Sequence, residues 1–233
     1  MGFFQDMLAV FKKRNLSFLD SFQELEDTYT FIFEKENDLN WEAGQHGLFT
    51  ITHKKMKDGT KPFTIASAPA ENVVKITTRI SDHPSKFKKA LLELEQGMKI
   101  GMSGPLGAFY LKEDSPAIFI AGGIGITPFR AILKQIEIEG NTIEKPKHLL
   151  YLDSKQSYLF KDELDGREGL INVNYLDSRD SLQQELDQLI STYKDKAQYF
   201  IAGPQEMVKT VTGHLQKHHI AKRNIKKDAF FGY

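Results

Sequence analysis

The sequence has 233 residues, which is enough for one large domain or two of ordinary size. Its 31 basic and 31 acidic residues cancel, so there is no overall positive field to attract nucleic acid, and we expect no DNA or RNA partner. Cysteine is absent, which excludes disulfides, thiolate zinc sites, cysteine nucleophiles and iron–sulfur clusters with cysteine ligands.

The chain starts with an apolar stretch, residues 1–13, which lacks the basic front and the small-residue cleavage site of a signal peptide. This stretch could form an amphipathic helix on a membrane surface, but packing onto the body or disorder is the interpretation that we favour. The most apolar run, residues 117–129, is too short and too rich in glycine to span a bilayer, which takes roughly 20 residues. We therefore predict a cytoplasmic protein.

The first half of the chain has the pattern of short strands separated by turns. Segments rich in Thr, Tyr, Phe and β-branched residues alternate with Gly, Pro, Asp or Asn. The segments are residues 21–34, 47–53, 62–67 and 73–80. Short strands at this spacing predict a small antiparallel β-barrel or sandwich.

One helix interrupts these strands. Phe87, Leu91 and Leu94 recur at helical spacing. Pro84 suits the first turn of such a helix, and Gly97 suits its end.

The second half alternates apolar strands with helices. The strands are expected at residues 117–121, 148–152, 171–176 and 199–202, and the helices at 128–139, 160–164, 181–193 and 205–218. This alternation predicts a parallel sheet with crossover helices. A charged, proline-containing break near residues 113–116 marks the boundary. We therefore expect two domains, an N-terminal antiparallel β-barrel at 1–114 and an α/β nucleotide-binding domain at 115–233.

A glycine-rich turn lies between the strand at 117–121 and the following helix. Gly122, Gly123 and Gly125 would let backbone amides approach a phosphate, and the helix N-terminus adds partial positive charge. Thr127 offers a hydroxyl at the cap, and Pro128 suits the first helical position. The turn could hold the pyrophosphate of a dinucleotide. A tight strand-to-helix turn with no ligand explains the same residues.

Six short motifs occur in an order that points to one family. They are Ala43-Gly44-Gln45, Lys61-Pro62-Phe63-Thr64, Gly104-Pro105-Leu106-Gly107, Gly122 to Pro128, Ala202-Gly203-Pro204 and the aromatic tail Phe230-Phe231-Gly232-Tyr233. From about residue 18 to the end, the chain resembles the ferredoxin–NADP reductase family of flavin-dependent NAD(P)H oxidoreductases. The second motif is similar to the Arg-x-Tyr-Ser/Thr flavin motif of that family.

The resemblance implies an FAD-binding β-barrel at 1–114 and an NAD(P)-binding α/β domain with an aromatic tail at 115–233. It implies hydride transfer between NAD(P)H and FAD, with electrons passing to a separate acceptor. A ferredoxin- or flavodoxin-type carrier or a small acceptor would fill that role. The alternative is a non-catalytic flavin-binding subunit that serves electron transfer or regulation in a larger complex.

The resemblance also assigns residues to the flavin. Phe63 would stack on the ring and Thr64 would hydrogen-bond near N5, so these two, with Tyr233, are the catalytic candidates. Lys61 stands where the family has Arg, and it neutralises a pyrophosphate without gripping it bidentately. FAD is favoured over FMN, and we expect weaker binding than in the family.

Further flavin contacts are expected from Ser67, Gly104 and Ser85, the last together with the helix amides. Two simpler explanations stay open. Phe63 and Thr64 could be a buried strand pair, and Ser85 could be an ordinary helix cap.

For the dinucleotide, the resemblance adds Gly203 and Pro204 to the residues of the glycine turn. Ser178 and Arg179 resemble the pair that holds the 2′-phosphate in NADP-using members, which favours NADP(H) over NAD(H).

Asp177 and Asp180 flank that pair and would repel a phosphate if they turned inward. In the alternative, Asp180 or Ser181 caps the helix at 181–193 and Arg179 lies in solvent. In the tail, Phe230, Phe231 or Tyr233 could cover the second face of the flavin.

Two histidines are candidate metal ligands. His214 and His218 are four residues apart on one helix, so they share a face. No HExxH pattern surrounds them and no third ligand is evident, so we predict surface histidines and no metal.

Overall fold

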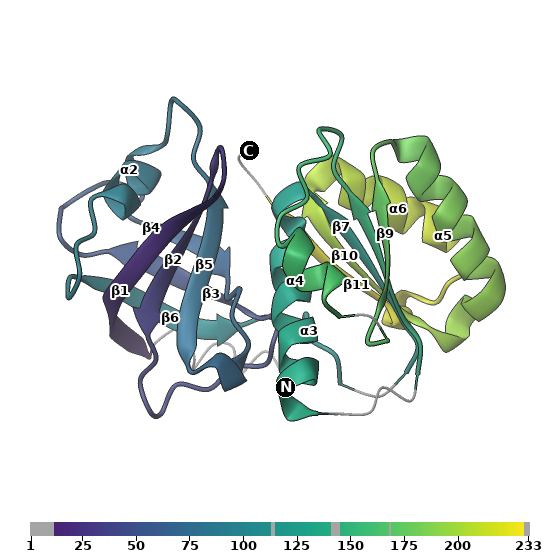
Figure 1. The fold of residues 1–233 in the computed structure, drawn as a ribbon, viewed down its shortest axis with the longest axis horizontal. Helices are drawn as coiled ribbons and strands as arrows, with labels where there is room; N and C mark the ends of the chain where they lie inside the picture. Colours follow the sequence, from purple (N-terminus) through teal and green to yellow (C-terminus); the bar gives the residue numbers. More distant parts are fainter. Residues whose placement is uncertain (1–11, 113–114, 141–144, 168, 231–233) are drawn as a thin grey trace. The chain divides into compact units, whose positions relative to one another are not determined.

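The computed structural model describes residues 12–112, 115–140, 145–167 and 169–230. The chain divides into two compact units, Met1–Tyr110 with Ala131–Glu139 and Leu111–Arg130 with Gly140–Tyr233, called the first and second unit below (Figure 1). The N-terminal stretch considered above as a membrane-surface helix falls largely outside the described residues.

The first unit is built on one six-stranded antiparallel sheet. Its strands are β1 (Lys13–Leu25), β2 (Thr28–Glu34), β3 (His46–Ile51), β4 (Thr60–Thr64), β5 (Val73–Arg79) and β6 (Lys99–Leu106). They are ordered β4-β3-β6-β1-β2-β5, so β4 and β5 are the two edges. The Ala66 amide donates a 2.8 Å hydrogen bond to the Lys75 carbonyl and brings the chain after β4 back onto β5. The sheet thus curls toward a barrel.

Two features of this sheet were not predicted. Residues 21–34, expected as one strand, contain a reversal of the chain at Glu26 and Asp27 that joins β1 to β2 as a hairpin. Strand β6 was not predicted at all, although it pairs with both β1 and β3. It carries Gly101, Gly104 and Pro105, residues that disfavour a strand when local propensity is the only guide.

A chain of aromatic rings fills the barrel. Ring centroids of Phe18 and Phe33 lie 5.7 Å apart, and those of Phe33 and Phe49 lie 6.4 Å apart. Helix α2 (Lys86–Leu92) adds Phe87 to the same core. Ser85 is the N-cap of α2, so Pro84 precedes the helix and is not in its first turn as predicted. The helix ends at Leu92, before Gly97, which sits at φ +87° in the next turn.

The second unit is a five-stranded parallel sheet ordered β11-β10-β7-β8-β9. Its strands are β7 (Ala117–Gly122), β8 (Lys147–Leu152), β9 (Asn172–Leu176), β10 (Gln198–Pro204) and β11 (Ile225–Phe230). Its α-helices are α4 (Lys161–Asp165), α5 (Arg179–Tyr193) and α6 (Gln205–Lys217), preceded by α3 (Thr127–Glu139), which is shared with the first unit. Its short 3₁₀ turns are η2 (Gly123–Ile126), η3 (Lys194–Lys196) and η4 (Lys222–Asn224), whereas η1 (Pro69–Glu71) lies in the first unit.

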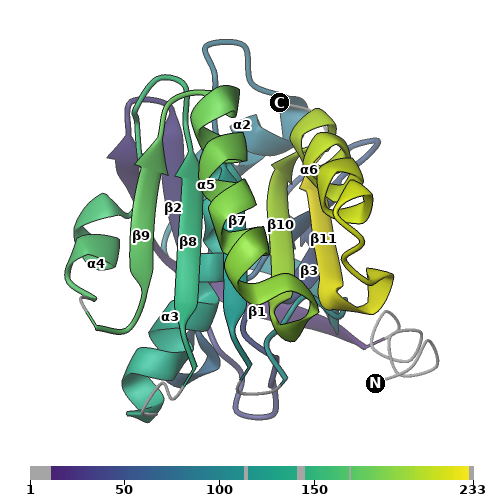
Figure 2. The same cartoon turned by 90° about the vertical axis from the view of Figure 1, so that its right-hand side faces the viewer.

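Helices α5 and α6 cover one face of the parallel sheet (Figure 2). Their apolar sides share one buried cluster with alternate residues of β7 and β10, which are Ile118, Ile120, Tyr199 and Ile201. The residues between them face the other way, where Phe119 packs on Phe129 of α3 at 5.1 Å. The strands are therefore buried on both faces, as the apolar runs predicted.

Strand β11 is the one strand of this sheet that the sequence did not reveal. Ile225–Phe230 contains Lys226, Lys227 and Asp228, and such a charged segment lacks the apolar run of a buried strand. Its place at the edge of the sheet, paired only with β10, explains how it tolerates these charges.

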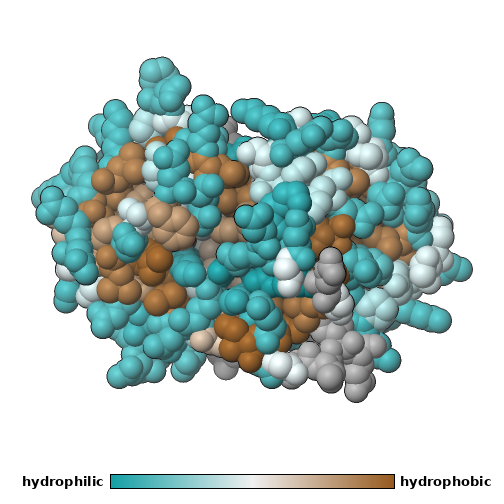
Figure 3. Space-filling model, in the orientation of Figure 1, coloured by the Kyte–Doolittle hydropathy of each residue, from teal (hydrophilic) through white to brown (hydrophobic). Residues whose placement is uncertain are grey.

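The face drawn in Figure 3 is mostly hydrophilic with smaller apolar areas. Among the described residues, the large hydrophobic side chains that are exposed are Leu19, Phe22, Leu92 and Ile138. None of the described helices combines the length and the apolar character needed to cross a bilayer.

Candidate active site

Two polar side chains on β4 are available to a ligand. Lys61 is exposed, and within the described residues its ammonium forms no ion pair or hydrogen bond. Thr64 is 8% exposed, and its hydroxyl likewise has no hydrogen-bond partner in the described part of the chain. Because β4 is an edge strand, a ligand can reach these groups from the open side of the sheet.

Phe63 lies on the opposite face of β4 from Thr64, as strand geometry requires. Its ring stacks on Phe87, with centroids 5.5 Å apart and planes 29° apart, and meets the edge of Phe49 at 6.1 Å. The predicted flavin-stacking ring therefore belongs to the barrel core, and protein occupies the side that faces Phe87. A flavin would have to approach the remaining face or edge.

Ser67 has a structural role that the sequence did not show. It is completely buried, and its hydroxyl donates to the Val73 carbonyl at 2.7 Å and accepts from the Lys75 amide at 3.0 Å. The indole of Trp41 donates to its carbonyl at 3.2 Å. These bonds satisfy the Ser67 hydroxyl within the protein, and the cofactor contact expected of Ser67 stays a prediction.

The Ala43-Gly44-Gln45 turn is tied to the loop that contains Gly107. The buried Gln45 side chain donates from Nε2 to the Gly107 carbonyl at 2.8 Å and accepts from the Glu42 amide at 2.8 Å. Gly44 has φ +102°, and a Cβ there would lie under 3.0 Å from the Phe109 carbonyl oxygen. Two motifs whose joined residues are 62 positions apart in the sequence thus form one buried polar joint.

The remaining predicted flavin contacts lie at a loop and a helix end. Gly104 has φ +123°, a conformation that L-residues with side chains rarely adopt, so its contribution is backbone shape. Ser85 is exposed, and its hydroxyl accepts from the Lys88 amide at 3.3 Å. The capping role predicted as an alternative is therefore present, while the hydroxyl hydrogen of Ser85 has no described acceptor.

The glycine turn after β7 is shaped by close packing against β10 and α6. A Cβ on Gly125 would lie under 3.0 Å from the carbonyl oxygen of Ala202, and one on Gly122 would overlap the Sδ atom of Met207. Gly203, at φ +150°, faces the same methionine. Gly125 is therefore required by a backbone contact within the protein, whereas the contact at Gly122 is with the end of a flexible side chain. The pyrophosphate role of the turn stays a prediction.

Thr127 and Pro128 also differ in detail from expectation. Helix α3 begins at Thr127, so Pro128 is its second residue. The buried Thr127 hydroxyl donates to the Ile124 carbonyl at 3.2 Å and closes η2. Its hydrogen is used inside the turn, and the cofactor contact expected of Thr127 stays a prediction.

The predicted 2′-phosphate pair follows β9. Ser178 is the N-cap of α5, since its hydroxyl accepts from the Ser181 amide at 3.2 Å, so neither Asp180 nor Ser181 is the cap. Arg179 is exposed and, in the described part of the chain, has no ion-pair partner. Asp177 accepts a long 3.4 Å hydrogen bond from Gln156.

Asp228 is the only acidic residue next to the aromatic tail, and its sequence context did not support a proton or polarity role. It pairs in register with Ala202, the residue on which Gly125 packs. Its carboxyl has no hydrogen bond to any described residue, and burial raises its pKa from 3.8 to about 6.

Phe230 is opposite Pro204, while Phe231 and Tyr233 lie outside the described residues.

Comparison with known proteins identifies the fold. Residues 119–213 match the family model of the oxidoreductase NAD-binding domain. Ferredoxin-NADP+ reductase from Plasmodium falciparum superposes with a TM-score of 0.80 at 16% identity, over 95% of this chain and 97% of that one. The chain has the fold of the ferredoxin–NADP+ reductases. The predicted fold class and the resemblance to this family are confirmed.

The curated relatives align with this chain over only part of their own length. Toluate 1,2-dioxygenase electron transfer component of Pseudomonas putida is 25% identical over 226 residues, which is 91% of this chain and 66% of that protein. One component of the Na(+)-translocating NADH-quinone reductase of Shewanella putrefaciens is 33% identical over 95 residues, 37% of this chain and 32% of the relative. The chain thus spans between about a third and two thirds of the curated relatives that it matches.

The packing of the glycine turn predicts that two glycine substitutions have opposite effects on the stability of the fold. Gly125→Ala should lower the free energy of unfolding by about 1–3 kcal/mol, because the added methyl group overlaps backbone of β10. Gly213→Ala, inside α6 with nothing within 4 Å of the new Cβ, should raise it by about 0.5–1 kcal/mol. Urea unfolding of both variants measures the difference. Equal stability of the two variants would contradict the packing described for the turn.

The burial of Asp228 predicts that removing its carboxyl group raises the stability of the fold in a pH-dependent way. A carboxyl whose folded pKa is about 6, against 3.8 when unfolded, destabilises the fold increasingly as the pH rises from about 4 to 6. Asp228→Asn should therefore be more stable than wild type at pH 8, by at most about 3 kcal/mol, and equally stable at pH 4. Urea unfolding at both pH values tests this, with the exposed Asp82→Asn as control. A gain of the same size at pH 4 would show that desolvation is not its cause.

Proposed function

We propose that this protein is a flavin-dependent NAD(P)H oxidoreductase that transfers hydride between NAD(P)H and FAD and passes electrons to a separate acceptor. The observation that carries the proposal is the pair of unpartnered polar groups, Lys61 and Thr64, on the edge strand of a barrel with the ferredoxin–NADP+ reductase fold. The alignment with an electron transfer component over 91% of this chain supports it independently.

In this proposal, residues 1–114 bind the flavin and residues 115–233 bind the nicotinamide nucleotide, with the tail covering the flavin. The first unit fits FAD in two respects. Among the described residues, the Lys61 ammonium has no partner and could neutralise a phosphate, and the Thr64 hydroxyl has none and could donate toward flavin N5. Bound FAD supplies the redox chemistry by accepting a hydride and releasing electrons one at a time. Ser85 and the first amides of α2 add donors for phosphate oxygens.

The chain's own residues orient the cofactors and set the local charge. The glycine turn presents backbone amides at the carboxyl end of β7, the edge of a parallel sheet at which ligands bind. Asp228 stands beside Ala202 at that edge, with a pKa of about 6 for its carboxyl, so it can be neutral or charged near physiological pH. A group in that state can hold or release a proton.

Two observations favour the alternative, a non-catalytic flavin-binding subunit. Phe63 already stacks on Phe87, and Lys61 cannot grip a pyrophosphate bidentately. Both features would weaken flavin binding without abolishing the fold. Electron transfer to a partner protein is common to both proposals, and the partner would be a redox carrier or an oxygenase component.

Anaerobic reduction distinguishes the two functions. Protein purified in excess FAD should be yellow, and its visible absorption should bleach when NADPH or NADH is added without oxygen. Boiled protein with the same FAD is the control. Protein that retains flavin but is not reduced supports the non-catalytic subunit, and protein that takes up no flavin contradicts both.

Substitutions in β4 should separate flavin binding from flavin reduction. Lys61→Ala removes a charge-assisted contact worth about 1.5–3 kcal/mol, so FAD affinity should fall roughly 10- to 150-fold. Thr64→Ala should slow flavin reduction more than it weakens binding, because its hydroxyl is placed near N5. Fluorescence titration of FAD and stopped-flow reduction measure the two effects, with Lys57→Ala, an exposed lysine in the β3–β4 connection, as control. Unchanged FAD affinity in the Lys61 variant would place the phosphate elsewhere.

For the nucleotide, we propose a preference for NADP(H), with Ser178 and Arg179 holding the 2′-phosphate. Arg179 is exposed, without a described ion-pair partner, at the start of α5, where the helix end adds partial positive charge. Asp177, Asp180 and the buried Asp153 place negative charge in the same region. The named relatives differ too, since one belongs to an NADH-quinone reductase and another is a ferredoxin-NADP+ reductase.

Arg179→Ala should raise the KM for NADPH roughly tenfold or more and leave the KM for NADH nearly unchanged, because one arginine–phosphate contact is lost. Steady-state assays with a dye acceptor measure both constants, and Arg223→Ala, an exposed arginine of η4, is the matched control. A wild type that prefers NADH would overturn the NADP assignment and leave the flavoenzyme assignment standing.

A further inference from the structure

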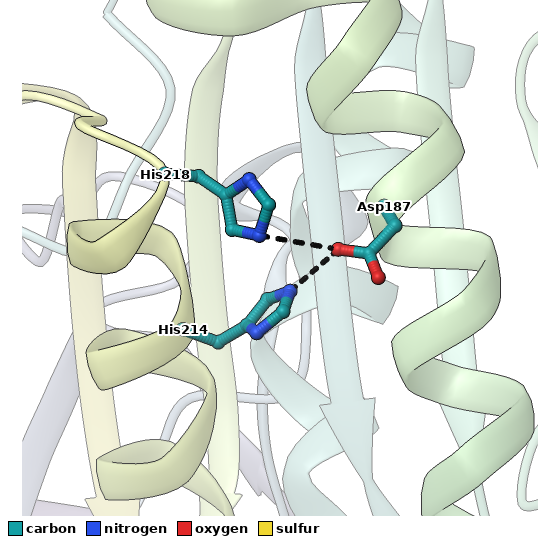
Figure 4. A group of neighbouring side chains, drawn as sticks. All are labelled: Asp187, His214 and His218. Carbon is teal, nitrogen blue, oxygen red and sulfur yellow. Dashed lines mark hydrogen bonds and ion pairs between the residues drawn. The ribbon is translucent and has the colours of Figure 1, made fainter.

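Helices α5 and α6 bring together three side chains with metal-ligating atoms (Figure 4). Asp187 comes from α5, and His214 and His218 come from α6 and its C-cap. One ligand atom from each lies within 4.8 Å of the others. The sequence showed two histidines on one helical face but no third ligand. The third ligand is Asp187, which is 27 residues from His214 in the sequence.

The three side chains converge on one point. The Nε2 atom of His214 lies 2.6 Å from Oδ1 of Asp187, and the Nε2 atom of His218 lies 3.6 Å from the same oxygen. The two imidazole rings are 4.6 Å apart. Figure 4 shows both rings directed at the carboxylate from the same side. Ligand atoms about 2.0–2.2 Å from a tetrahedral zinc ion are roughly 3.3–3.5 Å apart, so small side-chain rotations suffice to enclose an ion.

The helices hold these positions firmly, while the outer side stays open. Leu186 and Ile190 of α5 and Val211 and Leu215 of α6 are buried in the same apolar cluster, which fixes the two backbones. The exposed fraction of the side chain is 18% for His214, 42% for Asp187 and 44% for His218. A partly exposed three-ligand site leaves room for water as a fourth ligand.

We propose that Asp187, His214 and His218 form a zinc(II) site that clamps α5 to α6. Two imidazoles with one carboxylate suit zinc, whereas magnesium and calcium prefer oxygen ligands alone. Helix α6 starts at the carboxyl end of β10 and runs back along the sheet. Its last turn therefore lies toward the amino ends of the strands, whereas the glycine turn lies at their carboxyl ends. The clamp therefore stabilises the helical layer and takes no part in nucleotide binding.

The same geometry without a metal is a hydrogen bond between His214 and Asp187. Zinc binding would replace the shared proton, because imidazole must be neutral and unprotonated at the ligating nitrogen. Direct metal titration distinguishes the two states.

The test uses the full chain without a polyhistidine tag, stripped with a chelator and titrated with zinc chloride in a calorimeter. Wild type should bind one equivalent, and its melting temperature should rise with zinc concentration. His214→Gln, His218→Gln and Asp187→Asn should each weaken binding by on the order of 100-fold or more, beyond the loss typical of an outer-sphere contact. His219→Asn should bind like wild type, since His219 is exposed outside the cluster and asparagine suits its φ of +61°.

His218 is the most exposed of the three, so its substitution leaves the packing of both helices unchanged. The His218→Gln variant therefore still tests the zinc site if the other two variants misfold. Cobalt(II) provides a second measurement, because a tetrahedral site gives intense visible absorption that the His218→Gln variant should lose. No zinc binding by wild type, or the same affinity in wild type and His218→Gln, would overturn the proposal.

Discussion

The close approach of the glycine turn to the end of β10 is the constraint on which the α/β unit depends. No side chain fits at Gly125, because the carbonyl of Ala202 occupies the space where a Cβ would lie. This contact fixes where η2 turns into α3, and it fixes the end of β10 on which β11 then pairs. Asp228 lies beside the same end of β10, because β11 pairs it in register with Ala202. The shape of the carboxyl end of the sheet around the glycine turn is thus set by backbone packing within the protein.

The first unit shows a similar division between scaffold and site. The Gln45 side chain joins two distant loops, and Ser67 joins the end of β4 to β5 through a buried hydroxyl. These buried hydrogen bonds are costly to break, because each would leave a polar group without a partner. Lys61 and Thr64 differ from them in having no partner within the described residues. Residues 61–67 thus contain both the bracing Ser67 and two polar groups without a partner among the described residues.

Much of the architecture follows from local sequence patterns. Apolar runs predicted β7, β8 and β10, and helical periodicity predicted α3, α5 and α6, because buried positions recur with the period of a helix or fill a buried strand. The order of short motifs indicated the reductase fold, since each motif needs a particular backbone shape. The two-domain class could therefore be predicted without any knowledge of contacts.

Tertiary structure alone decided the features that depend on distant partners. Strands β6 and β11 carry glycine, proline or charge, and they are strands because neighbouring strands complete their hydrogen bonds. Ser67 resembles a ligand residue in sequence, yet its hydroxyl is bonded to Val73 and Lys75 of β5, and its carbonyl accepts from Trp41. Asp187 joins two histidines only because α5 and α6 pack on the same face of the sheet. Local sequence sets which residues are apolar or flexible, whereas the direction of each polar side chain is set by neighbours that the fold brings from elsewhere.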